Sequence, residues 1–220
     1  MANPVKGDFV SVSYVGKIVE TGEVFDLTDE ARARQAGLYS EQVIYGPMTV
    51  RIGSGHMLAG LEDAVVQMAP GETRVVRISS DRAFGARDPS KIQTVPDKVF
   101  KEQKPVVGMI VNIQGLMGKV QSVSGGRVVL DFNHPLAGKE VEYEFTLEKV
   151  VTALNEKFAG ILRLHAHKGQ DAKFSLSGDV AEVILPPANP MPEGVMTEIF
   201  EESKEGVPEI KKVKFTYIFE

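Results

Sequence analysis

A set of aromatic, aliphatic and acidic residues in the first half of the chain has the chemistry of one pocket. A tyrosine, a Phe–Asp pair, a Gly–Leu step and a Phe–Gly pair occur there in separate segments, which are Val12–Gly16, Gly22–Asp26, Ile52–Leu61 and Asp81–Gly85. The set contains no activated nucleophile, no paired acids and no cluster of metal ligands. An apolar pocket with one carboxylate at its rim favours binding or bond rotation over bond cleavage.

The composition is that of an ordinary globular protein. The 220 residues are 43% hydrophobic and 25% charged, which suits one large domain or two to three small ones. A net charge of −5 argues against a nucleic-acid partner. The chain has no cysteine, which excludes disulfides, zinc–thiolate sites and cysteine nucleophiles. The first residues lack a signal-peptide pattern and no apolar stretch approaches about eighteen residues, so we expect a cytoplasmic protein with no membrane partner.

Alternation, helical spacing and turn signals predict strands and two helices in the first part of the chain. Strands are expected at Phe9–Glu20, Val24–Asp26, Tyr45–Ile52 and Thr73–Ile78, and helices at Thr28–Tyr39 and Met57–Met68. The first helix belongs to an excursion between two strands, with Thr28 as its expected N-cap. This excursion is interpreted as a surface insertion near the rim of the pocket.

The sequence pattern changes at Asp88. Prolines punctuate the next segment, and short strand patterns with glycine turns follow at Met109–Gly115, Gly118–Ser124 and Arg127–Phe132. A long strand pattern then returns at Val141–Val151. We infer a small β-rich domain inserted into a loop, so that the chain leaves the first domain near residue 87 and re-enters it near residue 134.

A third unit with an α-β-β-α-β pattern follows Val151. Its expected elements are Ala153–His165, Lys173–Leu176, Val180–Leu185, Glu193–Lys204 and Lys211–Phe219, with a Gly178–Asp179 turn between the two middle strands. Phe215, Tyr217 and Phe219 alternate along the last strand, which could pair with the same strand of a second copy. A homodimer through this C-terminal unit is therefore one hypothesis for its role.

Three stretches, VSVSYVGKIVETGEVFD, IGSGHMLAGLEDAVVQMAPGETRVVRI and SSDRAFGARDP, resemble the FKBP-type peptidyl-prolyl cis–trans isomerases and occur in the family's order. The insert and its exit, VPDKVF and VVLDFNHPLAG, resemble the SlyD-like branch with its insert-in-flap chaperone domain, and the extension resembles that of long archaeal members. The resemblance implies an α+β fold, in which an antiparallel twisted half-barrel sheet wraps on a short helix. It also implies three domains: isomerase (1–87 with 134–151), inserted β-rich chaperone domain (88–133) and C-terminal α+β domain (152–220).

Carried over by position, the resemblance assigns the residues of the site. It makes Tyr14, Asp26 and Phe84 catalytic. The substrate-binding residues are Phe25, Met48, Met57, Leu58, Leu61 and Tyr143. Leu61 stands where many members have a tryptophan and Met48 replaces a common aromatic, so the floor of the pocket is expected to be aliphatic. No cofactor is implied.

The resemblance further implies that the protein isomerises X–Pro bonds and thereby accelerates proline-limited folding, with unfolded or partly folded proteins as partners. The insert carries more apolar residues than a domain of about 45 residues buries. Those expected to form its chaperone surface are Val99, Phe100, Val107, Met109, Ile110, Leu116 and Met117. The same run could instead be the core of the insert. The alternative function is a holdase chaperone or binding module with little isomerase turnover.

Simpler interpretations apply to the aromatic and acidic residues taken singly. Tyr14, Phe25 and Phe84 are each of a type that usually packs in a core, and Asp26 could be a turn residue. Four segments in one order favour the pocket.

Two further patterns have structural interpretations. Gly53-x-Gly55 is not a dinucleotide fingerprint, because Leu58 occupies the third glycine position. The pair His165-x-His167 has metal-ligand spacing only in an extended chain, so we interpret it as a solvated helix end and expect no metal site.

Overall fold

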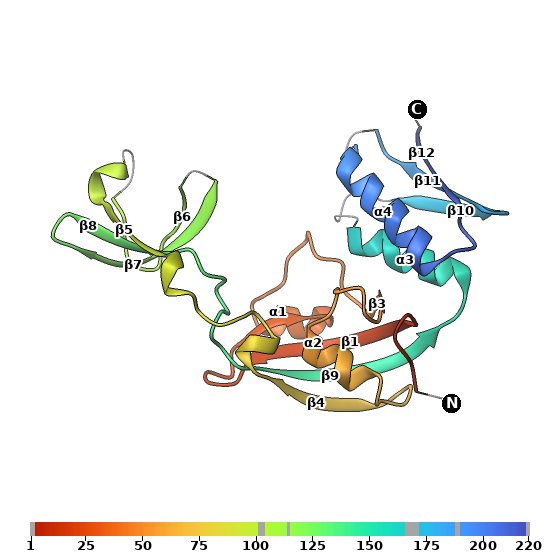
Figure 1. The fold of residues 1–220 in the computed structure, drawn as a ribbon, viewed down its shortest axis with the longest axis horizontal. Coiled ribbons are helices and arrows are strands. Elements are labelled where there is room, and N and C mark those ends of the chain that lie inside the picture. The colour runs from red at the N-terminus through yellow and green to blue at the C-terminus, as the bar shows by residue number, and fades with distance from the viewer. Residues whose placement is uncertain (1–2, 101–103, 114, 166–171, 188–189, 219–220) are drawn as a thin grey trace. The chain divides into compact units, whose positions relative to one another are not determined.

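The computed structural model describes residues 3–100, 104–113, 115–165, 172–187 and 190–218 (Figure 1). They divide into two compact units. The first contains Met1–Ile78 and Val141–Glu220, and the second contains Ser79–Glu140. Along the chain, the second unit is therefore inserted between two parts of the first.

A five-stranded antiparallel sheet forms the centre of the first unit. Its strands are β1 (Phe9–Ile18), β2 (Val24–Leu27), β3 (Met48–Arg51), β4 (Thr73–Ile78) and β9 (Val141–Val151). The order is β2-β1-β9-β4, and β3 pairs with β1. The two long strands pair from Phe9 opposite Val151 to Ile18 opposite Val141. Each of these strands was predicted from the sequence, β1 and β4 from alternation of apolar and polar residues.

Helix α2 (Ala59–Val65) buries Leu61 and Val65 in the first unit. It approaches β4 closely, because a Cβ atom at Gly60 would lie 2.8 Å from Cγ2 of Ile78. Any larger residue at this position would push the helix away from the sheet. The Gly–Leu step of the sequence thus permits close approach and fills the core.

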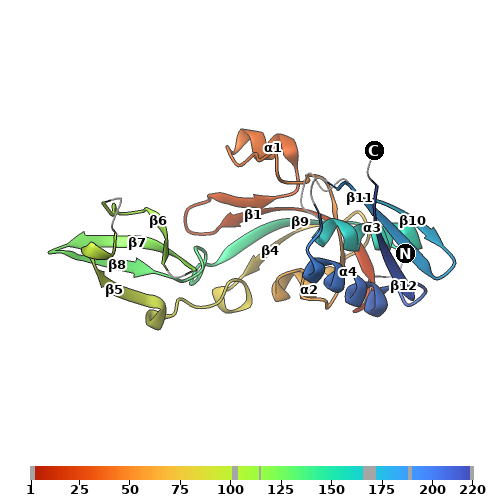
Figure 2. The same cartoon turned by 90° about the horizontal axis from the view of Figure 1, so that it is seen from above.

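Helix α1 (Glu30–Gln35) lies on the face of the sheet opposite α2 (Figure 2). Its buried Ala33 packs against Val15 and Leu27, together with half-buried tyrosines of the same excursion. The excursion therefore covers the outer face of β1 and β2.

The predicted N-cap of α1 was wrong by one residue. The side chain of Asp29 caps the helix by accepting a hydrogen bond from the backbone N–H of Arg32 at 2.8 Å. Thr28 Oγ1 instead accepts a hydrogen bond from the Tyr14 backbone N–H at 3.0 Å. The Thr28 hydroxyl therefore bonds to the backbone of Tyr14 on β1 and does not cap α1.

The second unit contains a four-stranded antiparallel sheet of order β5-β8-β7-β6. The strands are β5 (Ile92–Pro96), β6 (Ile110–Ile113), β7 (Leu116–Ser124) and β8 (Arg127–Asp131), and single 3₁₀ turns lie at Ser80–Arg82, Pro89–Lys91 and Asp97–Val99. Its core consists of Val111, Val120, Val128 and Leu130, all buried. The glycines between β7 and β8 both have positive φ, 56° and 73°, as a two-residue hairpin turn requires.

Strand β5 was not predicted from the sequence, because prolines flank it. It pairs with β8 along its length, and Pro96 stands at its last position, opposite Arg127. At the edge of a sheet a strand tolerates proline, since one row of its N–H groups needs no partner.

Asn133 joins the two chain segments at the base of this sheet. Its Oδ1 accepts a hydrogen bond from the Asp88 backbone N–H at 2.9 Å, and its Nδ2 donates to the Asp88 carbonyl at 2.9 Å. One side chain thus holds together two positions that are 45 residues apart in the chain. Arg87 and Asp131 add an ion pair of 2.7 Å beside it.

The C-terminal part of the first unit has the predicted α-β-β-α-β order. Its elements are α3 (Leu154–His165), β10 (Lys173–Ser177), β11 (Val180–Leu185), α4 (Glu193–Gly206) and β12 (Lys212–Tyr217). Strand β11 lies in the middle, antiparallel to β10 and parallel to β12. The core of this part includes Phe9 of β1 and Val151 of β9, both buried. The C-terminal elements therefore pack directly on the ends of the long strands.

Close contacts support this packing. A Cβ atom at Gly160 of α3 would lie 2.6 Å from Thr49 Cγ2, and one at Gly206 would lie 2.8 Å from the Phe9 ring. The Arg163 guanidinium donates hydrogen bonds of 2.7 to 3.1 Å to the carbonyls of residues 44–47, just before β3. Burial lowers the pKa of Arg163. The C-terminal part thus shapes the loop that leads into the first sheet.

The predicted fold class is confirmed, since the described residues form a mixed α+β structure with antiparallel sheets. Among them, no helix combines the length and the apolar character needed to cross a bilayer. Phe215 and Tyr217 pack against the C-terminal core, and Phe219 lies outside the described residues.

Candidate active site

Three aromatic rings pack together on the inner face of β1, β2 and β9. The Tyr143 ring makes edge contacts with Tyr14 and Phe25, each with ring centroids 5.7 Å apart. Gly16 makes this possible, because a Cβ atom there would lie 2.9 Å from Tyr143 and 3.0 Å from Phe25. We call Tyr14, Phe25 and Tyr143 the ring cluster.

A break in the β1–β2 register brings Phe25 and Asp26 to the same region. Val15 and Gly16 pair with Leu27 and Asp26, but the next residue of β1 pairs with Val24 and so skips Phe25. Adjacent residues of a regular strand point to opposite faces, whereas a bulge re-aims one of them. The Phe–Asp pair can therefore supply a ring and a carboxylate to one site.

Tyr14 links the ring cluster to polar groups. Its hydroxyl is hydrogen-bonded to the Asp26 carboxylate and lies 3.5 Å from Met48 Sδ. The backbone N–H of Leu27 also donates to Asp26. Five of the predicted site residues are therefore connected by contacts: the ring cluster, Asp26 and Met48.

Burial is the main cause of the shifted pKa values in this group. Burial, followed by the nearby Asp26 carboxylate, raises the pKa of both Tyr14 and Tyr143, so both phenols stay protonated at neutral pH. Burial also raises the pKa of Asp26 above its ordinary value of 3.8, while hydrogen bonds from Tyr14 and Leu27 oppose the rise. These phenols can donate hydrogen bonds, but they do not act as bases.

The raised pKa of Asp26 fixes the sign of its effect on stability. Below pH 3.8 its carboxyl group is protonated in the folded and the unfolded chain. As the pH rises, the unfolded chain loses this proton first, so the free energy of unfolding falls until the pH passes the folded pKa. The effect is small, because burial affects only the carboxyl group beside Tyr14, whereas Asp26 as a whole residue is exposed to solvent.

Helix α2 carries the predicted aliphatic residues. Leu61 is buried, whereas Met57 and Leu58 are half-buried at its start. Leu58 is the N-cap residue, and no side chain there caps the helix. The first backbone N–H groups of a helix lack partners within it, so a carbonyl of a bound peptide could accept from them.

Phe84 belongs to the second unit. Its ring stacks on His134 with ring centroids 4.7 Å apart and an interplanar angle of 1°. The Gly85 carbonyl next to it accepts a hydrogen bond from the Gly138 N–H at 2.8 Å. His134 was not predicted to be part of the site, although its place in the NHPLAG stretch was a usable signal.

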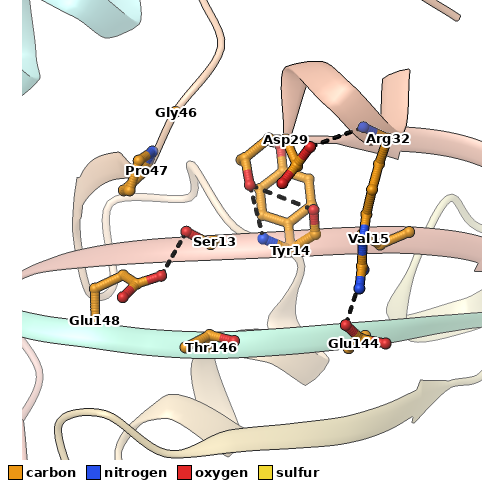
Figure 3. A pocket seen from close by; sticks show the side chains of 11 residues that line it. Ser13, Tyr14, Val15, Asp29, Arg32, Gly46, Pro47, Glu144, Thr146 and Glu148 are labelled. Carbon is orange, nitrogen blue, oxygen red and sulfur yellow. Dashed lines mark hydrogen bonds and ion pairs between the residues drawn. The ribbon is translucent and has the colours of Figure 1, made fainter. Parts of the chain in front are cut away.

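A polar groove lies on the opposite face of β1 and β9 (Figure 3). Its volume is about 300 Å³, and it is lined by Ser13, Tyr14, Val15, Thr28, Asp29, Arg32, Gly46, Pro47, Glu144, Thr146 and Glu148. Arg32 pairs with Glu144 at 2.9 Å, and Ser13 donates to Glu148 at 2.7 Å. This groove was not predicted from the sequence. Its charged lining does not suit a proline ring, which favours the ring-cluster face as the active site.

Replacing Tyr14 with phenylalanine is expected to raise the pKa of Asp26 further, because it removes a hydrogen bond that favours the carboxylate. A carboxyl ¹³C NMR titration of Asp26 measures this. As a control, Tyr39→Phe removes a hydroxyl from the α1 side of the sheet and should leave the pKa of Asp26 unchanged. A pKa that stays the same or falls in Tyr14→Phe would show that the phenol does not bond to Asp26.

Comparisons with known proteins identify the family of the chain. A family model described as FKBP-type peptidyl-prolyl cis-trans isomerase matches residues 1–105, and one described as FKBP26, IF domain, matches residues 93–136. The chain is 34% identical over 153 residues to a short-type peptidyl-prolyl cis-trans isomerase of Methanocaldococcus jannaschii, covering 69% of this chain and 96% of that protein. It is 29% identical over 139 residues to the FKBP-type peptidyl-prolyl cis-trans isomerase SlyD of Yersinia pestis, covering 61% and 71%.

A third relative, the FKBP-type 16 kDa peptidyl-prolyl cis-trans isomerase of Escherichia coli, is 27% identical over 114 residues, covering 49% of this chain and 76% of that protein. The resemblance inferred from the sequence motifs is confirmed. Because the archaeal relative is matched over nearly its whole length, the chain belongs to the FKBP-type peptidyl-prolyl cis–trans isomerases, a family of enzymes.

Proposed function

We propose that the ring cluster, Asp26, Met48 and the start of α2 bind the X–Pro segment of a substrate and catalyse its rotation. The observation that carries this assignment is the packing of Tyr14, Phe25 and Tyr143 over Gly16 on one face of the sheet. The resemblance also assigns Phe84 a catalytic role. Met57, Leu58 and Leu61 supply the aliphatic floor.

The physical task of the site is to lower a barrier of about 18–20 kcal/mol, which comes from amide resonance. The twisted transition state has lost this resonance, so its carbonyl is less dipolar than that of the planar bond. A water-poor apolar pocket therefore favours the twisted state over the planar one. No proton has to move, which agrees with phenols that stay protonated.

The polar groups of the site then hold the substrate in place. The Tyr14 hydroxyl and the Asp26 carboxylate form a fixed pair at the edge of the ring cluster. Backbone N–H groups in the first turn of α2 can hold a carbonyl that flanks the proline. Holding both sides of the bond allows binding energy to act on the rotation itself.

Phe84→Ala is expected to lower isomerase activity on an X–Pro tetrapeptide by about 10-fold or more, because a large apolar contact is lost. Asp26→Ala should lower it by only about 2- to 5-fold, since a single hydrogen-bonding group is removed. Exchange of the cis and trans peptide measured by NMR compares the two. Tyr39→Phe, on the other face of the sheet, is the control with wild-type activity. The reverse order of the two effects would contradict these roles.

We further propose that the inserted unit binds unfolded polypeptide and presents its prolines to the isomerase site. Its exposed apolar side chains support this: Val107, Ile110, Leu116 and Met117 are 60–67% exposed, and Val99 is 47% exposed. Phe100 and Met109 are half-buried against the small core of the unit, so they contribute less to this surface. A sheet that leaves this many apolar groups in water has the property expected of a binding surface.

Two hollows give this surface its shape. One, of about 860 Å³, is lined by Val107, Ile110 and Met117 among polar residues of the same unit. The other, of about 500 Å³, is lined by Val99 and Phe100 together with residues 109–113. Flexible methionine and aliphatic walls accept varied apolar side chains. Binding a chain here raises the local concentration of its prolines.

The triple variant Val107→Ser, Ile110→Ser, Met117→Ser is expected to slow the proline-limited refolding of a denatured protein at least several-fold. Its turnover of a short peptide should be unchanged. Val75→Ser is the matched control, because Val75 is 61% exposed but lies on β4 of the other unit. Unchanged refolding by the triple variant would contradict the proposal. A wild-type protein that binds unfolded chains but turns over no peptide would instead support the holdase alternative.

The C-terminal part is proposed to support a homodimer. Within the described residues, β12 has β11 as its one strand partner, so its other edge can pair with a second copy. Phe215 and Tyr217 face the core of their own domain, and pairing would therefore use the backbone.

Sedimentation of the full chain should give twice the monomer mass. A variant that lacks residues 152–220 should sediment as a monomer. It should also carry Phe9→Ser, because the deletion uncovers that buried ring. An equal, monomeric mass for both proteins would contradict the dimer.

A further inference from the structure

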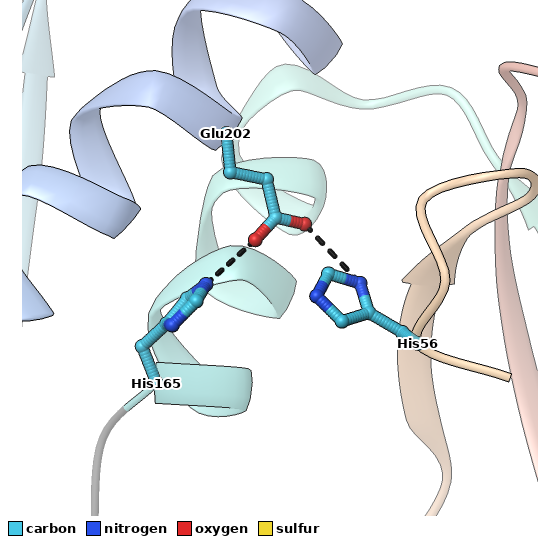
Figure 4. Close-up of side chains that lie close together, drawn as sticks. All are labelled: His56, His165 and Glu202. Atoms are coloured by element: carbon cyan, nitrogen blue, oxygen red, sulfur yellow. Dashed lines mark hydrogen bonds and ion pairs between the residues drawn. The ribbon is translucent and has the colours of Figure 1, made fainter.

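Two histidines and one glutamate from distant parts of the first unit converge at one point (Figure 4). His56 precedes α2, His165 is the last residue of α3, and Glu202 lies on α4. One ligand atom of each lies within 4.8 Å of those of the other two. Glu202 lies between the rings: its Oε2 is 2.6 Å from His165 Nε2, and its Oε1 is 3.4 Å from His56 Nδ1.

The interpretation of His165 as a solvated helix end was therefore wrong. Its side chain is only 16% exposed, and it is held against the carboxylate of Glu202. The spacing His165-x-His167 was not the relevant signal, and His167 lies outside the described residues. The partners come from α4 and from the loop before α2, which sequence spacing could not reveal.

The carboxylate of Glu202 is buried without a full set of partners. Its side chain is 9% exposed, and its Oε1, the oxygen on the His56 side, has no hydrogen-bond partner among the described residues. Burying an ionised oxygen without a partner is costly, and proteins usually compensate with a hydrogen bond or a cation. This oxygen therefore indicates that the cluster is built for a ligand.

Neighbouring side chains hold the two rings in the way that metal ligands are held. His165 Nδ1 lies 3.3 Å from the Glu198 carboxylate, on the opposite side of the ring from Glu202. His56 Nδ1, which also faces Glu202, lies 2.7 Å from Ser54 Oγ, so the other ring nitrogen, Nε2, is the one left for an ion. An outer carboxylate or hydroxyl commonly orients a metal-binding imidazole.

We propose that His56, His165 and Glu202 bind a divalent transition-metal ion, with Zn²⁺ favoured by this set of donors. Two imidazole nitrogens and one carboxylate match zinc sites that keep a fourth position for water. Imidazole also suits Ni²⁺, Co²⁺ and Cu²⁺, whereas Mg²⁺ and Ca²⁺ prefer oxygen ligands. Bonds of about 2.0–2.2 Å place tetrahedral ligand atoms about 3.3–3.6 Å apart. The 2.6 Å contact between His165 Nε2 and Glu202 Oε2 must therefore lengthen by roughly 0.7 Å or more to admit the ion.

The ion would join parts of the chain that have different roles. His56 is adjacent to Met57 and Leu58, which the proposed function places in the substrate site. His165 and Glu202 belong to the C-terminal helices. A bound ion would therefore fix the loop that begins α2 to α3 and α4, and this holds whether or not the substrate site is correctly assigned.

The test uses the full chain after treatment with a chelator, titrated with ZnCl₂ by isothermal calorimetry. We expect one ion per chain with a dissociation constant of about 1 μM or lower. Glu202→Gln and His56→Ala should each weaken binding by about 100-fold or more, because even outer-shell changes cost about 10- to 100-fold. MgCl₂ should not compete with Zn²⁺.

Two matched controls separate this site from others. Glu201→Gln removes the same charge from the exposed neighbour of Glu202, and His134→Ala removes a histidine from the other unit. Both should bind Zn²⁺ as the wild type does. The melting temperature should rise with Zn²⁺ in the wild type and both controls, but not in Glu202→Gln.

The proposal is overturned if Zn²⁺ fails to bind at 100 μM, an affinity limit of about −5.5 kcal/mol. It is equally overturned if Glu202→Gln and His56→Ala bind Zn²⁺ as tightly as the wild type. Glu202→Gln keeps the size of the side chain, so the circular dichroism of its metal-free form should match the wild type. If that variant does not fold, His56→Ala decides, because His56 lies in a loop.

Discussion

The pairing of β1 with β9 is the constraint on which the other features depend. It joins residues 9–18 to residues 141–151, and it places Gly16 opposite Tyr143. Only a residue without a side chain leaves room at that point for the rings of Tyr143 and Phe25. A slip of one residue would turn Tyr14 to the outer face and bring Val15 inward, because side chains alternate along a strand. The ring cluster exists only in this register.

The two faces of the same strands have different chemistry for this reason. The inner face carries the rings and the buried aliphatic residues that pack with them. The outer face carries Ser13, Glu144, Thr146 and Glu148, which line the polar groove beneath α1. Phe25 and Asp26 are the exception, since the break in register lets neighbours in sequence act together. The local irregularity thus lies at the proposed functional site, where such features concentrate.

Much of the first unit could be predicted from local patterns. Alternation predicted β1 and β4, and helical spacing predicted α2 and α3, because each of these elements buries one face. Strand-like patterns predicted β2, β3 and β9, and α4 was predicted as a short helix. The approximate position of α1 was also predicted, but its cap was not: Asp29 and Thr28 are both good caps, and a hydrogen bond from Tyr14 on another strand decided between them. Strand β5 was missed because Pro96 normally ends a strand, and only its place at a sheet edge explains it.

The candidate site was predictable to a different degree. The ring cluster followed from a family pattern, but the bulge at Phe25 was not predicted. Its one signal was that Phe25 and Asp26, which are adjacent in sequence, were both assigned to one pocket. Two adjacent residues of a regular strand point to opposite faces. The cluster of His56, His165 and Glu202 had no signal in sequence spacing, since its members lie on three elements far apart in the chain. Tertiary structure alone brings them together.

The bonds of Arg163 to the carbonyls of residues 44–47 have a consequence for the order of assembly during translation. The first third of the chain leaves the ribosome before its partner strand β9 has been made. Arg163, which fixes the loop before β3, is made later still. In the inserted sheet, by contrast, β6, β7 and β8 pair as consecutive hairpins, and such local pairing forms fastest. The inserted unit can therefore be complete while the main sheet of the first unit still lacks strand β9.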